Sequence, residues 1–107
     1  MITRRFLTYN TMSKLVALDF EVFGTVQGVF FRKYTQQKGQ ELGLKGWCMN
    51  TSKGTVVGQL EGEESRVEEM KRWLQYKGSP QSSITKAVFQ NEKEITQPSF
   101  KSFDIRK

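Results

Sequence analysis

A glycine-punctuated stretch near the front of the sequence has the residue types of an anion-binding loop. In FGTVQGVFFRKYT, residues 23–35, Gly24 and Gly28 are followed by Arg32. Glycine lets the backbone turn through conformations that a side chain disfavours, and successive backbone amides in a tight turn form a concave site for an anion. A helix N-terminus and an arginine would both favour a phosphate there. Taken alone, such a stretch is more commonly a plain strand-to-helix turn with a solvated arginine.

The sequence also narrows the chemistry by what it lacks. It has no histidine, and it has no G-x-x-x-x-G-K-[ST] loop of the kind that binds nucleoside triphosphates. Cys48 is the only cysteine, which excludes an internal disulfide and a cysteine-rich metal site. Because no histidine is present to activate it, we expect Cys48 to be a small strand residue and not a nucleophile. Asn50, just before the turn sequence TSKG, is by itself a typical hairpin residue.

Length and composition indicate one soluble globular domain. The chain has 107 residues, of which 36% are hydrophobic and 26% charged, and no apolar run approaches membrane-spanning length. Its formal net charge is +6, and Arg4, Arg5 and Lys14 supply half of it where no acidic residue is nearby. The remainder is only mildly basic, which weakens a nucleic-acid-binding function and is compatible with a small anionic substrate.

The first fourteen residues differ in composition from the rest. They are rich in threonine and basic residues and contain no acid. We expect residues 1–14 to be a disordered extension; a targeting segment for mitochondrial import is the alternative, and Met12 could be a second start. The folded domain is expected to cover residues 15–107, and the single cysteine suits a reducing cytoplasm.

Hydrophobic periodicity predicts a strand before the glycine loop and a helix after it. Leu18, Phe20 and Val22 alternate with their neighbours as in a strand with one buried face. Residues 31–44 predict a helix that stops at Gly43. Its expected apolar stripe consists of Phe31, Tyr34, Thr35 and Leu42.

A hairpin and a second helix follow. Residues 45–50 and 55–62 predict two strands joined by a turn in which Gly54 takes a positive φ. Ser65 and Glu68 form a candidate capping box at the start of the helix. Gly78 and Pro80 end that helix, whose apolar stripe consists of Val67, Met70, Trp73 and Leu74.

The last two predicted strands complete a known layout. Residues 82–90 and 100–106 form these strands, and the final one is the least expected to pair centrally. The order strand, helix, strand, strand, helix, strand closes most simply as an α+β fold, a ferredoxin-like split βαβ sandwich (βαββαβ) in which an antiparallel sheet carries two helices on one face.

Two motifs together resemble the acylphosphatase family. FGTVQGVFFR is followed by GWCMNTSKGTV, and MKRWL, GSP and NEK further downstream are also similar to that family, so that the likeness extends from about Leu15 to Lys107. The resemblance implies a hydrolase that cleaves the carboxyl-phosphate anhydride of small acyl phosphates to a carboxylate and inorganic phosphate. It also implies a ferredoxin-like monomer that uses no metal and no organic cofactor, with phosphate as product and inhibitor.

The resemblance assigns roles to individual positions. Arg32 would hold the substrate phosphate, Asn50 would position the attacking water, and Thr51 would support Asn50 through its hydroxyl. The bulky Phe30 departs from a minimal loop and bears on the loop's shape. The backbone amides implied to cradle the phosphate oxygens belong to Gly24, Thr25, Val26, Gln27, Gly28, Val29, Phe30 and Phe31.

Two other functions are weighed against this one. A ferredoxin-like sheet with exposed aromatics can bind single-stranded RNA, but the stacking aromatics expected on the central strands are not evident in the sequence. A catalytically silent interaction domain that kept the fold is the other alternative, and the joint presence of Arg32 and Asn50 argues against it. We therefore expect no nucleic-acid or membrane partner.

Overall fold

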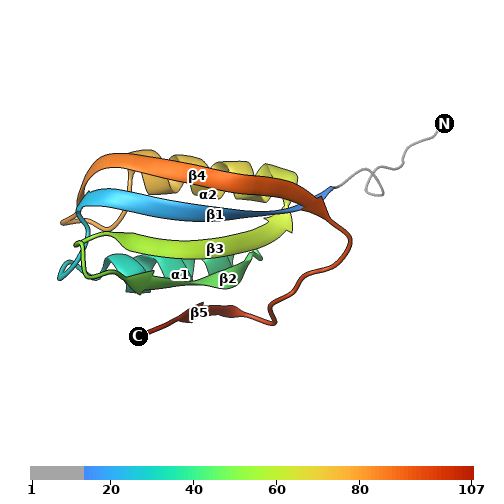
Figure 1. Cartoon of the computed structure of the whole chain (residues 1–107), viewed down its shortest axis with the longest axis horizontal. Coiled ribbons are helices and arrows are strands. Elements are labelled where there is room, and N and C mark those ends of the chain that lie inside the picture. The colour runs from blue at the N-terminus through green and yellow to red at the C-terminus, as the bar shows by residue number, and fades with distance from the viewer. Residues whose placement is uncertain (1–13) are drawn as a thin grey trace.

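Five strands and two helices make up the part of the chain that the computed structural model describes, residues 14–107. The expectations for the N-terminal extension, including Met12, lie outside these residues, except at Lys14. Figure 1 shows the sheet with both helices on one face, behind the strands. In chain order the elements are β1 (Leu15–Thr25), α1 (Phe31–Glu41), β2 (Lys45–Asn50), β3 (Val56–Glu63), α2 (Glu64–Tyr76), β4 (Ser83–Ile95) and β5 (Phe103–Ile105).

The sheet confirms the ferredoxin-like arrangement and adds one parallel strand. Its order is β4-β1-β3-β2-β5, and the first four strands pair antiparallel. β5 pairs parallel with β2, with Gly46 opposite Phe103, so the sheet is mixed and not wholly antiparallel. The reason is the connection 96–102, which crosses one end of the sheet from β4 to the far edge (Figure 1). The chain therefore re-enters running opposite to β4, in the direction of β2.

The core lies between the sheet and the helices. On β1 the predicted alternation is confirmed, because Leu18, Phe20 and Val22 are buried while the residues between them are partly exposed. The stripe predicted for α2 is buried throughout, and the rings of Phe31 and Trp73 lie 5.8 Å apart where the two helices meet. Removing this apolar surface from water is the main stabilising term of such a fold.

Helix α1 differs from its predicted stripe. Phe31 and Thr35 are buried, but Tyr34 is exposed, so its assignment to the stripe is wrong. Gly39 takes the buried place instead, because a Cβ there would lie 2.8 Å from the Phe103 ring. The helix can thus approach β5 closely, and the glycine that weakens the helix in isolation is required by tertiary packing.

Helix α2 starts without the predicted capping box. It begins at Glu64, so Ser65 already lies inside the helix, and its preceding residue makes no side-chain cap within the described chain. The Glu64 amide instead donates a hydrogen bond of 2.9 Å to the Lys14 carbonyl. Because β3 runs directly into the helix, a backbone oxygen does what a capping side chain would do. The predicted stop is confirmed by Gly78, which has φ 63°.

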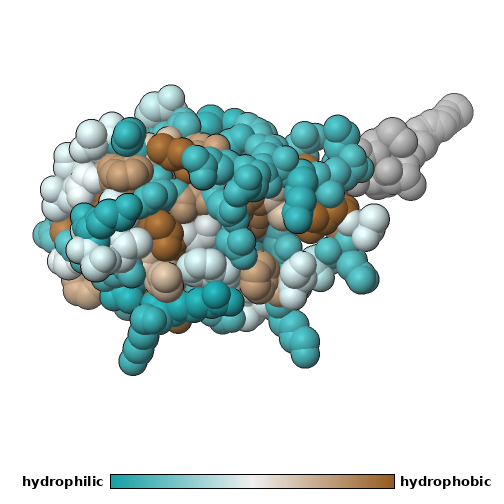
Figure 2. All heavy atoms as spheres, in the orientation of Figure 1, coloured by the Kyte–Doolittle hydropathy of each residue, from teal (hydrophilic) through white to brown (hydrophobic). Residues whose placement is uncertain are grey.

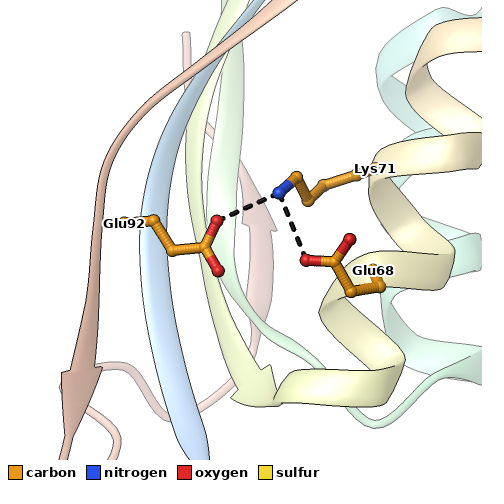
Figure 3. Close-up of polar contacts among 3 residues, drawn as sticks. All are labelled: Glu68, Lys71 and Glu92. Atoms are coloured by element: carbon orange, nitrogen blue, oxygen red, sulfur yellow. Dashed lines mark hydrogen bonds and ion pairs between the residues drawn. The ribbon is translucent and has the colours of Figure 1, made fainter.

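Side-chain contacts tie the sheet to α2 and to the long crossover. Lys71 reaches from α2 to Glu92 of β4 at 3.0 Å and to Glu68 at 3.2 Å (Figure 3). Burial by itself lowers the pKa of Lys71, but hydrogen bonds to the two carboxylates outweigh this and raise it above its ordinary value. The buried carboxylate of Glu61 accepts hydrogen bonds from the amides of Ser99 and Phe100, and so holds the crossover against β3.

Candidate active site

The glycine-punctuated stretch divides between a strand end and a short loop. Gly24 and Thr25 are the last residues of β1 and pair with Ile84 and Ser83 of β4. A Cβ on Gly24, where φ is 127°, would collide with the Ser83 carbonyl oxygen. This glycine is therefore required by close strand pairing, and the loop that leads into α1 begins only at residue 26.

The loop turns twice through left-handed backbone conformations. Gly28 has φ 75°, and Phe30 has φ 60° and ψ 24°. Apart from Gly28 and its two chain neighbours, no heavy atom of the described residues lies within 4 Å of where a Cβ on Gly28 would sit, so this side of the loop is open. Phe30 precedes α1 and makes no side-chain cap within residues 14–107. The first-turn amides of an eleven-residue helix are thus left without a side-chain acceptor.

Loop, helix and hairpin enclose a small pocket whose charge is positive. Its volume is about 280 Å³. Arg32 and Lys33 are its charged lining residues, and no carboxylate side chain of the described chain lines it. Within residues 14–107 Arg32 takes part in none of the ion pairs. The lining residues are Val26, Gly28, Phe30, Phe31, Arg32, Lys33, Asn50 and Ile105.

Asn50 brings a buried acceptor to the same pocket. It is the last residue of β2, and its Oδ1 is buried with no hydrogen-bond partner among residues 14–107. Burying an amide oxygen without a partner costs about 1–3 kcal/mol. An unpartnered acceptor beside Arg32, which has no ion pair among residues 14–107, fits a site whose hydrogen-bond partners arrive with the ligand.

Gln27 joins the loop to the hairpin that carries Asn50. Its Nε2 donates hydrogen bonds to the carbonyl oxygens of Thr51, at 2.9 Å, and Thr55, at 3.0 Å. Figure 1 shows the loop after β1 and the β2–β3 turn at the same end of the sheet. The sequence pointed only to the backbone amide of Gln27. A glutamine before a turn gives no signal for a contact with residues 24 and 28 positions further along the chain.

Among residues 14–107 the Thr51 hydroxyl makes its hydrogen bonds within the turn that follows Asn50. It lies 2.6 Å from the Thr55 hydroxyl and accepts hydrogen bonds from the amides of Lys53 and Thr55, both at 3.2 Å. The Thr55 hydroxyl in turn donates to Glu21 of β1 at 2.7 Å. Any support from Thr51 to Asn50 thus passes through the backbone of the turn, whose Gly54 has the predicted positive φ of 87°.

Cys48 lies beneath the site as a thiol. It is fully buried in β2, and its Sγ donates to the Arg32 carbonyl oxygen at 3.8 Å. Burial raises its pKa to about 12, an effect that the positive charge of Arg32 only partly opposes. A neutral thiol is a poor nucleophile, which agrees with the interpretation of Cys48 as a packing residue. Its contact helps to set the first turn of α1 against β2.

Fold and pocket together define a ferredoxin-like α+β domain with a positively charged pocket between one loop, one helix and one hairpin. The acylphosphatase family model matches residues 18–105. The chain is 59% identical over 92 residues to acylphosphatase-1 of Xenopus tropicalis, an alignment that covers 86% of this chain and 94% of that one.

Solved structures agree with the sequence match. An acylphosphatase from Coxiella burnetii aligns with a TM-score of 0.76 and 33% identity, covering 90% of this chain and 99% of that one. An acylphosphatase from Bacillus subtilis aligns with a TM-score of 0.79 and 28% identity over 86% and 99% of the two chains. This chain belongs to the acylphosphatase family. It is an acylphosphatase, a hydrolase whose small-molecule substrate is an acyl phosphate and whose product is inorganic phosphate.

Proposed function

We propose that the pocket performs this hydrolysis by dividing the work between Arg32, which holds the phosphoryl group, and Asn50, which directs water at it. The loop amides from Gly24 through Phe31 complete the cradle, with those beyond Thr25 nearest the pocket. The observation that carries the proposal is the buried, unpartnered Oδ1 of Asn50 in the same small cavity as an arginine that forms no ion pair within the described chain.

Phosphate binding follows from the donors that converge on the pocket. An arginine fork donates two parallel hydrogen bonds to phosphate and stays charged at any working pH. The two left-handed turns at Gly28 and Phe30 and the start of α1 add backbone amides and a partial positive charge. Inorganic phosphate carries the same oxygens as the substrate, so it should bind as a competitive inhibitor.

Asn50 suits the positioning of water because its free atom is an acceptor. A water that donates a hydrogen bond to Oδ1 keeps a lone pair free to attack phosphorus. Gln27 ties the loop to the turn after Asn50, and the Thr51–Thr55 hydroxyl pair stiffens that turn. These contacts hold the water-binding atom in register with the cradle, and such alignment is a large part of catalysis when little covalent chemistry is needed from the protein.

The reaction needs no proton donor for its leaving group. Water attacks phosphorus, the bond from phosphorus to the acyl oxygen breaks, and a carboxylate departs with the bonding electron pair. A carboxylate is a weak base, with a pKa near about 4, so it leaves without protonation. Phosphoryl transfer passes through a loose transition state in which charge stabilisation and positioning dominate. A site made of arginine, backbone amides and one side-chain amide is sufficient for that task.

The face of the sheet away from the helices argues against RNA binding as the main function. Figure 2 shows that this face is largely hydrophilic, with separate apolar spots. Its hollow is lined by Asp19 and Glu21 of β1, next to Trp47. Asp19 accepts hydrogen bonds from Gln59 and Asn91, both at 2.7 Å. Carboxylates at the middle of the face would repel the phosphates of a nucleic acid, so we propose a small anion and not a polynucleotide as ligand.

The family match and the buried cysteine also bear on the bounds of the catalytic domain, its oligomeric state and its cellular compartment. The family match at residues 18–105 supports a catalytic domain of residues 15–107 and, with it, the monomer that the resemblance implies. The one cysteine is a buried thiol, which suits a reducing compartment such as the cytoplasm.

The test separates binding from catalysis within the pocket. Phosphate release from benzoyl phosphate and acetyl phosphate is measured for the parent and for Asn50→Ala, together with inhibition by inorganic phosphate. We expect Asn50→Ala to lower kcat at least about a hundredfold, the scale expected when a reacting group is misplaced, while the inhibition constant for phosphate changes little. Near-normal kcat would remove Asn50 from the mechanism. Lost phosphate inhibition would make Asn50 part of the cradle instead.

A further inference from the structure

Phe30 carries two costs that the packing of the domain does not explain. Its side chain is 69% exposed to solvent, although it is a large apolar residue. Its backbone is also left-handed, at φ 60° and ψ 24°, a region that residues with a Cβ adopt at a cost of about 1–2 kcal/mol. A glycine at this position would remove both costs. Strained, exposed apolar residues that persist at a pocket are candidates for contact with a ligand.

The pocket gives this ring a place relative to the substrate. Val26 and Phe31 line the inner part and are 1% exposed, and Asn50 Oδ1 is buried there. Gly28, Phe30 and Lys33 line the same pocket and are exposed, so they form its mouth. Because water and leaving group lie on opposite sides of phosphorus, water held at Asn50 puts the acyl group on the side of the mouth.

Among the described residues that line the pocket, Phe30 and Ile105 are the apolar side chains that are not fully buried. Ile105, on β5, is partly exposed and packs against the edge of the core. Lys33 shares the mouth, but a long solvated cation next to a pocket needs no special explanation. A flat apolar group leaving the phosphoryl site would therefore meet an aromatic ring and an aliphatic side chain.

We propose that Phe30 determines substrate specificity by packing its ring against the acyl group, and that the favoured substrates are acyl phosphates with a flat apolar acyl group, such as an aroyl group. This inference rests on the proposed function, since it requires the phosphoryl group to be held at Arg32 with the water at Asn50. The exposed ring loses its contact with solvent when such an acyl group binds. Small or strongly hydrated acyl groups gain nothing from it.

The test compares two substrates that differ only in the acyl group. Values of kcat/KM for benzoyl phosphate and acetyl phosphate are measured for the parent and for Phe30→Gly and Phe30→Asn, two residues that tolerate the left-handed backbone. We expect each variant to lower the benzoyl-to-acetyl ratio of kcat/KM about tenfold, mainly through KM for benzoyl phosphate, as expected for loss of an aromatic contact. Any change in the loop amides affects both substrates alike and cancels in the ratio.

Tyr34→Ala is the matched control. Tyr34 is also an exposed aromatic residue of the α1 region but does not line the pocket, so its loss should leave the ratio within about twofold of the parent. A ratio that stays at the parent value in either folded Phe30 variant overturns the proposal. Unfolding of both variants also overturns it, because the ring would then have a structural role. A parent that hydrolyses neither substrate would instead contradict the proposed function itself.

Discussion

Two cations of this domain occupy opposite situations. Lys71 reaches across from α2 to β4 and is held by two carboxylates (Figure 3). Its ammonium lies 5.4 Å from the centre of the Phe89 ring. Arg32 lies in the first turn of α1, but it faces a pocket without a carboxylate and forms no ion pair with any residue from 14 to 107. The charge of Lys71 is balanced by carboxylates of the fold, whereas the charge of Arg32 remains available to an anionic ligand.

This difference separates stability from function. A cation with internal partners contributes to folding and has little left to offer a ligand. A half-buried cation without partners is costly in the free protein and binds an anion strongly for the same reason. Substitutions at the two sites should therefore have opposite effects on activity and on stability.

The largest effect is expected for Arg32→Lys. Lysine keeps the positive charge but not the two-pronged donor, so kcat/KM for benzoyl phosphate should fall about a thousandfold and inhibition by phosphate should weaken. The melting temperature should not fall, because the guanidinium has no internal ion pair within the described chain to lose. Lys71→Arg is the control and should retain activity. Parent-like hydrolysis by Arg32→Lys would show that Arg32 is not the anchor.

Gln27→Ala should produce an intermediate effect on activity. The change breaks the two hydrogen bonds that join the loop to the carbonyls of Thr51 and Thr55, so the cradle and the water-binding amide lose their mutual register. We expect kcat to drop about tenfold or more, by misalignment of groups that themselves remain present. Gln37→Ala, on the exposed side of α1, is the matched control. Equal kcat values for the two variants would limit Gln27 to its backbone amide.

Lys71→Met should affect stability alone. Urea unfolding at pH 7 should show a loss of about 1 kcal/mol, the scale of a partly exposed ion-pair network, with kcat/KM within about twofold of the parent. Because the pKa of Lys71 is raised in the folded state, the stabilisation is fully present below its ordinary pKa of 10.5 and is lost as the pH rises through the raised value. The gap between parent and variant should therefore close in strongly alkaline solution. A gap that widened there would contradict this assignment.

The smallest effect is expected on deletion of residues 1–13. The deletion stops before Lys14, since the Lys14 carbonyl accepts the hydrogen bond from the first amide of α2. Every element and every pocket residue described above lies beyond it. We expect kcat/KM to stay within about twofold and the melting temperature within about 2 °C, the range of a change that leaves the core untouched. A large fall in melting temperature would mean that the extension packs on the domain.

Local sequence patterns predicted the parts of the fold that local physics decides. Alternation placed β1, glycines placed the hairpin turn and the end of α2, and the apolar stripe of α2 is buried as expected. The sequence could not reveal that the α2 amide uses the Lys14 carbonyl, because that contact depends on how β1 and β3 pair. Tyr34 is exposed and Gly39 is buried for the same kind of reason, since Phe103 decides which side of α1 is covered.

The residues of the candidate site also fall into two groups, those that the sequence predicted and those that it could not predict. Arg32, Asn50 and the loop were found from the two motifs, and the structure brings them into one pocket. The side chain of Gln27, the wall formed by Ile105 and the left-handed Phe30 were not predicted. Each depends on contacts or backbone angles that arise only after distant segments meet, and a single sequence carries no signal for them.

The parallel pairing of β5 with β2 has a consequence for how activity is gained during folding. Gly46 must meet Phe103, so a loop that contains β3, α2 and β4 has to close before β5 can add to the sheet. Such distant contacts slow folding, because loop-closure entropy is spent before the contacts form. Since Ile105 on β5 is part of the pocket wall, recovery of hydrolysis after dilution from denaturant should follow the docking of this last strand and not the formation of the helices.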